Sequence, residues 1–296
     1  MPEDFHYGGQ AVIEGVMMRG RRYLSMAVRR SSGEVVLTTR PLPSAYTGRI
    51  RKIPLVRGVV ALVETLVLGI QVLFQSANLS LGEEGEEVPG PLLWGALAAS
   101  LSFAIALFFL APMFIANFIN VDSSILSNII EGLIRIAIFI LYLALINLIP
   151  DIREIFAYHG AEHKTVNAYE DHAPLEPAAV RKYSTAHVRC GTSFLFAVLI
   201  IAIVLFALLG HQSLWLRIVS RIVLLPVIAA FGYEFTRISA RYADNRVMRV
   251  FFAPGLALQM MTTRQPSDDQ VEVAISALKG VIEADSPQAG SPQAGS

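Results

Sequence analysis

The sequence predicts a predominantly α-helical membrane protein with about four transmembrane helices, a further helix that does not cross, an N-terminal β-rich module and a cytoplasmic His-bearing helical segment. The 296-residue chain is 54% hydrophobic and only 16% charged, whereas a soluble domain has roughly 25% charged residues. It contains uncharged stretches long enough to cross a hydrocarbon core of about 30 Å. Its lysines and arginines gather outside those stretches, which also predicts an orientation.

Residues 1–53 form the predicted cytoplasmic β-rich module. Alternation over 24–28 and β-branched residues over 35–39 flank a turn at 31–33, a pattern typical of a hairpin. The stretch 8–20 places an apolar strand between glycines and lacks the Gly-Lys-Ser/Thr of a phosphate loop. We expect these glycines in turns and close packing. The functional alternative is that Glu14, within this stretch, reaches the site.

Residues 54–81 are predicted to be an interfacial or re-entrant helix. Its polar residues fall on one narrow stripe, and the remainder is apolar; the stripe consists of Arg57, Glu64, Gln71, Gln75 and Asn78. An acidic loop follows at 82–87.

The predicted spans lie in two pairs. The region 82–149 carries transmembrane helices 1 and 2, and 192–240 carries helices 3 and 4; the spans themselves are 92–117, 125–149, 192–210 and 216–238. The connections between the paired spans contain no lysine or arginine.

Positive charge predicts the orientation. Residues 1–57 contain ten lysines and arginines, 150–191 contain five, and 237–264 contain five. Positive charge favours the cytoplasmic side, so both termini and the 150–191 segment are expected there in a multi-pass cell-membrane protein. If 54–81 also crossed the membrane, either the arginine-rich N-terminus would lie outside the cell or every later loop would change sides.

The C-terminal region 241–284 is predicted to be cytoplasmic and to contain an amphipathic helix. Ser267 and Gln270 have the spacing of a capping box. Apolar residues then recur at helical spacing from Val271 to Ile282. The tail 285–296 repeats a polar unit with Pro and Gly, which predicts disorder.

The strongest chemical pattern is His159-Gly160-Ala161-Glu162-His163, on a helix that we expect to start with Asp151 as its N-cap. On a helix the two histidines lie one turn apart on one face, with Glu162 beside them. His187 and Cys190 precede the third span and share a face if that stretch is helical. Glu234 is predicted near the cytoplasmic end of the fourth span.

Three interpretations of these residues stay open. The first is a divalent-metal site, with zinc expected, in which His159 and His163 are completed by Glu162, His187, Cys190 or Glu234. In the His-x-x-Glu-His metalloproteases the glutamate is the base, which assigns catalysis to Glu162. The second is a structural polar cluster. The third makes Cys190 a nucleophile activated by His187 or His159.

Long motifs in the chain resemble the YqhQ-like family of uncharacterised bacterial membrane proteins; they are Gly8–Gly20, Tyr158–Asn167, His187–Ser193, Arg57–Gly69 and Pro254–Leu256. The resemblance extends over roughly residues 8–265. It implies a metal-dependent enzyme, as that family is described, and it implies no particular reaction.

The resulting functional hypothesis is a cytoplasm-facing, membrane-embedded metal-dependent hydrolase of unknown substrate. A non-enzymatic membrane scaffold or partner-binding protein is the alternative, and a transporter is a third class, although four spans without an internal repeat disfavour it. The expected partners are the lipid bilayer and proteins that bind the cytoplasmic regions. No nucleic-acid recognition motif is present, and one cysteine cannot form an intramolecular disulfide.

Overall fold

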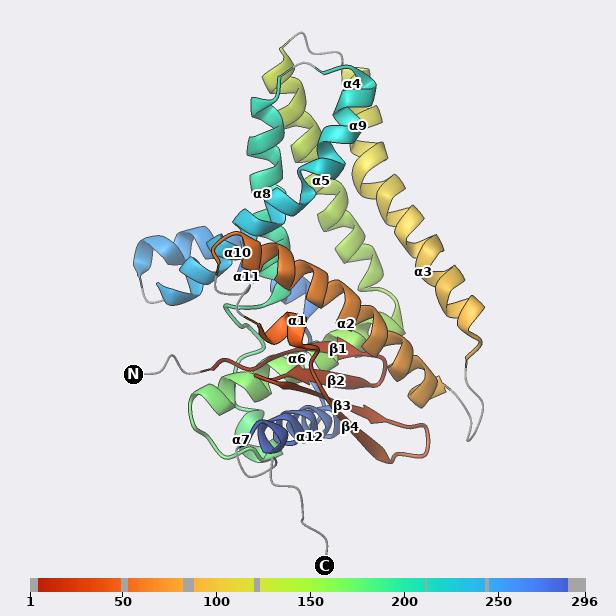
Figure 1. The fold of residues 1–296 in the computed structure, drawn as a ribbon, viewed down its shortest axis with the longest axis vertical. Coiled ribbons are helices and arrows are strands. Elements are labelled where there is room, and N and C mark those ends of the chain that lie inside the picture. Colours follow the sequence, from red (N-terminus) through yellow and green to blue (C-terminus); the bar gives the residue numbers. More distant parts are fainter. Residues whose placement is uncertain are drawn as a thin grey trace, which may run out of the picture.

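The computed structural model has a helical bundle at one end and a β-sheet layer with its own helices at the other (Figure 1). It describes residues 5–48, 53–81, 88–119, 123–210, 212–242 and 245–286. The predicted acidic loop at 82–87 lies outside this described part, as do residues 287–296 of the predicted tail.

The N-terminal module is a four-stranded antiparallel sheet in sequence order, formed by β1 (Gly8–Val12), β2 (Gly15–Arg19), β3 (Tyr23–Arg29) and β4 (Val35–Pro41). The predicted hairpin is confirmed as β3–β4, and Gly33 has a φ of 87° in its turn. The prediction of a single strand over residues 8–20 was wrong. The chain reverses at Glu14, whose φ is 51°, and pairs β1 with β2.

Both faces of the sheet are covered. Helices α6 (Pro150–Glu170) and α12 (Asp268–Asp285) pack on one face, where Ala27 joins a core with Tyr158 and Leu278. Helix α2 (Val56–Leu81) covers the other face and runs obliquely between the sheet and the bundle (Figure 1). There Met26 and Val28, the strand neighbours of Ala27, contact Leu68 and Val72 as one cluster. The alternation of strand side chains therefore ties the N-terminal module to helices from the middle and end of the chain.

The bundle contains the predicted spans, formed by α3 (Gly90–Ile105), a π-helical turn η2 (Ala106–Leu110), α4 (Ala111–Ile119), α5 (Ser124–Ile146), α8 (Gly191–Leu208), α9 (Leu214–Val223) and α10 (Leu225–Arg241). Within the described ranges, four helices are long and apolar enough to cross a membrane: 56–80, 90–119, 125–146 and 191–208. These helices are compatible with a membrane protein. The non-crossing placement of α2, the orientation and the cytoplasmic termini stay predictions.

The predicted fourth span, residues 216–238, is divided into two helices in the structure. Helices α9 and α10 meet at a bend of 42°, so they form either one broken span or a re-entrant element. Pro226 lies at the second position of α10. It lacks the N–H that would continue the helical hydrogen bonding, and its ring clashes with the preceding turn.

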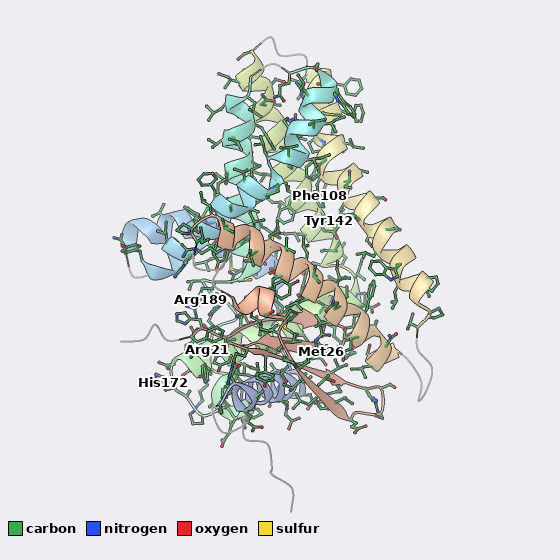
Figure 2. The ribbon with its side chains drawn as sticks, viewed as in Figure 1. Arg21, Met26, Phe108, Tyr142, His172 and Arg189 are labelled. Atoms are coloured by element: carbon green, nitrogen blue, oxygen red, sulfur yellow. The ribbon has the colours of Figure 1, made fainter. Side chains whose placement is uncertain are left out.

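Buried charges in the bundle form one cluster, in which two arginines share a single glutamate. Glu131 on α5 accepts hydrogen bonds from Arg135 at 2.7 Å and from Arg221 of α9 at 2.7 and 2.8 Å. Arg135 also donates to the carbonyl of Phe108 in the π-helical turn at 2.8 Å, and Figure 2 shows Phe108 beside Tyr142 within the bundle. Ionisable groups buried between apolar helices destabilise a structure unless they are paired. Here their hydrogen bonds connect α5, α9 and η2.

The remaining helices frame α6. Its N-cap is Ile149 with Pro150 as the first helical residue, so the assignment of Asp151 as N-cap was wrong. Proline suits that position because the N–H it lacks would be unbonded there. The capping box of α12 is confirmed, and its apolar stripe is buried against the sheet. Two short helices, α1 (Ser44–Thr47) and α7 (Pro177–Val180), and α11 (Arg246–Thr262) complete the chain.

The β1–β2 turn makes stability depend on pH. Burial, followed by the nearby charge of Glu154, raises the pKa of Glu14, which accepts a hydrogen bond from Tyr158. A carboxyl whose pKa is raised on folding stabilises the fold when protonated and loses that contribution as pH rises. We expect Glu14→Gln, which keeps an acceptor for Tyr158, to raise the melting temperature at pH 8 in detergent. The gain should shrink towards about pH 4, near the ordinary pKa of glutamate. An equal gain at both pH values would contradict this.

Candidate metal centre

Two histidines and the cysteine converge at the junction between the sheet layer and the bundle. His159, His163 and Cys190 offer ligand atoms that all lie within 4.8 Å of one another. The histidine ring centroids are 4.4 Å apart on α6, and Cys190 Sγ lies 3.3 Å from His159 Nε2. Cys190 is the N-cap of α8. A helix of the sheet layer and a helix of the bundle therefore each contribute to one cluster.

Backbone carbonyls determine which nitrogen of each ring carries the proton. His159 Nδ1 lies 2.9 Å from the Thr262 carbonyl, and His163 Nδ1 lies 2.5 Å from the Thr185 carbonyl. Because a carbonyl only accepts, each Nδ1 must donate, which leaves a lone pair on each Nε2. Metal-binding histidines use this arrangement, in which the second ring nitrogen is held by an outer acceptor.

Glu162 adjoins the cluster through one oxygen and is held through the other. Its Oε1 accepts the N–H of Gly9 in β1 at 2.9 Å, and its Oε2 lies 3.5 Å from His163 Nε2. The residue is 4% exposed. Gly9 permits this approach, because a Cβ there would overlap the Met17 carbonyl and come within 2.9 Å of Glu162 Cγ. The Gly-rich stretch thus reaches the site through its backbone, whereas Glu14 contacts Tyr158.

His187 lies beside the cluster with an unused ring nitrogen. Its ring centroid is 5.6 Å from that of His163, and its buried Nε2 forms no hydrogen bond in the part of the chain described. The nearest carboxylate oxygen, from Glu170, is 3.6 Å away. Burial lowers the pKa of His187, and the charge of Glu162 opposes this shift. A buried imidazole nitrogen that forms no hydrogen bond within the described residues suits a ligand-binding or substrate-binding site better than a completed polar cluster.

The stretch that carries His187 is irregular and not helical. His187 and Cys190 therefore do not share a helix face, as they would if the stretch were helical. Gln259 of α11 holds His187 instead: it accepts the His187 N–H at 3.0 Å and donates to the His187 carbonyl at 2.7 Å. Figure 2 shows Arg189, from the same stretch, between bundle and sheet, and His172 just past the C-terminal end of α6.

Glu234 does not join the cluster. Its carboxylate accepts two hydrogen bonds from the Arg57 guanidinium and one from the Leu55 N–H at 3.1 Å, which fastens α10 to the start of α2. The sequence predicts where Glu234 lies along the span, but it does not predict which way the side chain points. The ion pair with Arg57 removes the reason to assign it as a ligand.

The carbonyls that surround α6 come from the connection between α7 and α8. Lys164 donates to the carbonyls of Arg181 and Tyr183, both at 2.7 Å, and burial lowers its pKa. Asn167 donates to two further carbonyls of this connection at 2.9 and 3.0 Å. No role was predicted for Lys164 and Asn167, or for Thr185, Thr262 and Gln259. A lysine and an asparagine directly after the His pair were the available signal.

Comparison with known proteins identifies the family. A family model described as "Protein of unknown function (DUF1385)" matches residues 53–284. The chain belongs to this family. It is also 32% identical over 294 residues to the protein described as "Uncharacterized protein YqhQ" from Bacillus subtilis (strain 168), across 93% of this chain and 92% of that protein. No solved structure matches.

The resemblance to the YqhQ-like family is thus confirmed, and its predicted extent is corrected. The family model reaches residue 284, so it includes α12, which the sequence analysis had placed outside. The burial of α12 against the sheet explains why it belongs with the rest. Neither description names an activity.

The contact between Gly9 and Glu162 can be tested with a neighbouring glycine as control. We expect Gly9→Ala to displace Glu162 and to destabilise the protein, because the added methyl group overlaps the Met17 carbonyl. Overpacking of this kind costs typically about 1–3 kcal/mol. Gly8→Ala should be near neutral, since nothing lies within 4 Å of the added methyl group. Thermal unfolding in detergent measures both, and equal effects would refute the proposed close approach.

Proposed function

We propose that this chain is a cytoplasm-facing, membrane-embedded hydrolase that depends on a divalent metal, zinc, held by His159, His163 and Cys190. The observation that carries the proposal is the pair of Nδ1–carbonyl hydrogen bonds, which leave both Nε2 atoms available beside a thiol. Imidazole and thiolate are the ligands that zinc prefers.

The donor set fits a catalytic site better than a closed structural one. Three ligands would leave the fourth position of a zinc site to a water molecule, and zinc would lower the pKa of that water to about 7. Glu162 stands next to the cluster with Oε1 held by Gly9 and Oε2 directed towards His163. Its role is to take a proton from the attacking water and return it to the leaving group as the scissile bond breaks.

His187 has a separate role in this proposal. The ligand atoms that lie within 4.8 Å of one another do not include those of His187, so we assign its Nε2 to a hydrogen bond with the substrate rather than to the metal. Glu170 lies beside the same nitrogen, with an oxygen 3.6 Å away, and it also pairs with Arg189 and lies 3.4 Å from His6.

A second candidate is nucleophilic catalysis by Cys190. The observation in its favour is the 3.3 Å separation between Cys190 Sγ and His159 Nε2, with the His159 Nδ1–H held by Thr262. This arrangement resembles a cysteine activated by an oriented imidazole base. In that mechanism His159 accepts the thiol proton as Cys190 attacks the substrate carbonyl. The proton then passes to the leaving group as its bond to the carbonyl breaks, and water hydrolyses the resulting thioester.

Metal content is the first test. The purified full-length protein should contain roughly one equivalent of zinc, as a single tetrahedral site requires. His163→Ala should lose it, because one of the three ligands is removed. His172→Asn is the matched control: this histidine is exposed at the end of α6, with a φ of 55° that asparagine tolerates. Metal-free wild-type protein, unchanged in stability by a chelator, would sink the zinc assignment.

Glu162→Gln separates a catalytic metal from a structural one. We expect this variant to keep zinc and its fold but to lose activity by about 10²–10⁴-fold, the usual contribution of a general base. Complementation of a deletion strain, together with hydrolysis of a panel of amides and lipid esters, would measure it. Full complementation by Glu162→Gln favours the scaffold alternative. Activity that survives chelation but disappears on alkylation of Cys190 favours the cysteine mechanism.

A further inference from the structure

An apolar groove of about 260 Å³ lies between α5, α8 and α11. Every residue that lines it is apolar, and examples are Ile136 and Ile140 from α5, Phe196 and Leu199 from α8, and Leu258 and Met261 from α11. Such a lining cannot pair the polar groups of a peptide or a sugar. Two of the three helices are long and apolar enough to cross a membrane. The chemistry therefore favours a hydrocarbon chain as the occupant.

Helix α11 contributes both to this groove and to the surroundings of the candidate metal centre. Leu258 and Met261 line the groove. The residues that follow each of them belong to the site: Gln259 holds the backbone of His187, and the Thr262 carbonyl accepts from His159 at 2.9 Å. An occupant of the groove thus contacts residues adjacent in the helix to those that position His187 and His159.

Two arginines lie at the same end of α11. Asn147, the C-cap of α5, donates to the Met261 carbonyl at 2.6 Å. Arg153 donates to the Asn147 carbonyl at 2.7 Å, and Arg264 donates to its side-chain oxygen at 3.3 Å. Both arginines are exposed, and within the described residues neither forms an ion pair with a carboxylate. Exposed guanidinium groups beside an apolar groove match a phosphate attached to an acyl chain.

We propose that the substrate of the candidate site is an anionic phospholipid of the bilayer, with an acyl chain in the α5–α8–α11 groove and its phosphate at Arg153 and Arg264. The proposal rests on the proposed hydrolase function. It narrows the substrate from amide or lipid to a lipid that carries negative charge. The groove accounts for the chain, and the arginines account for the headgroup.

Photo-crosslinking tests this proposal on the full-length protein in nanodiscs. The probe is phosphatidylglycerol with a diazirine in its acyl chain, and mass spectrometry locates the adducts. We expect adducts on the groove faces of α5, α8 and α11. Ala257→Phe should reduce them several-fold, because Ala257 lines the groove and is exposed enough to accept a larger side chain. Met260→Phe is the matched control on the same helix, since Met260 is 75% exposed and does not line the groove.

Headgroup selectivity is measured in the same samples. Arg264→Gln should lower the preference for phosphatidylglycerol over phosphatidylcholine by about five-fold, the effect of one basic residue near an anionic surface. Arg264→Lys should retain most of that preference. Equal adduct yields in Ala257→Phe and Met260→Phe, or an unchanged preference in Arg264→Gln, would overturn the proposal.

Zinc content, measured alongside, separates the two proposals. Wild-type protein without zinc contradicts the proposed function whatever the adducts show. Protein with zinc but without groove-specific adducts contradicts only the phospholipid assignment. If Ala257→Phe itself loses zinc, Ile140→Phe on α5 obstructs the groove from the opposite wall and provides the same comparison.

Discussion

The buried polar face of α6 is the constraint on which the rest of the structure depends. Glu162, His163 and Lys164 are each at most 4% exposed, and each carries groups that water can no longer satisfy. An unpaired buried donor or acceptor costs about 1–3 kcal/mol. The connection before α8 therefore passes close to α6, where its carbonyls accept from Lys164 and His163. The same requirement brings the end of α11 to His159.

Packing around α6 links the two ends of the molecule. On one side the sheet reaches the helix through Gly9, and on the other Gly160 lets the backbone at Arg264 approach, where the Arg264 N–H donates to the Phe156 carbonyl at 2.9 Å. A larger side chain at either glycine would separate the layers. The candidate metal centre thus lies where a helix of the sheet layer meets the first turn of a bundle helix, and its candidate ligands come from both.

The two histidines and Glu162 could be predicted because they lie within one turn of a single helix, where spacing determines direction. Cys190 and His187 could be predicted as further candidate ligands, but their positions relative to the histidine pair could not. They lie in an irregular segment, which has no periodicity that would orient its side chains. Glu234 was misassigned for a related reason. Its depth along a span follows from residue count, but the face it presents depends on how α10 is rotated against α2, and Arg57 decides that. The break at Pro226 leaves this rotation independent of the first half of the span.

The sequence alone determined the apolar helices, the β3–β4 hairpin, the capped last helix and the His pair, because each follows from local periodicity or from a local turn or cap. Only the tertiary structure decided the reversal at Glu14, the bend between α9 and α10, the pairing of Glu234 with Arg57, and the protonated nitrogen of each histidine. These features depend on partners far away in the chain. The carbonyls of Thr185 and Thr262 lie 22 and 103 residues from the rings they contact, and no local pattern records such a contact.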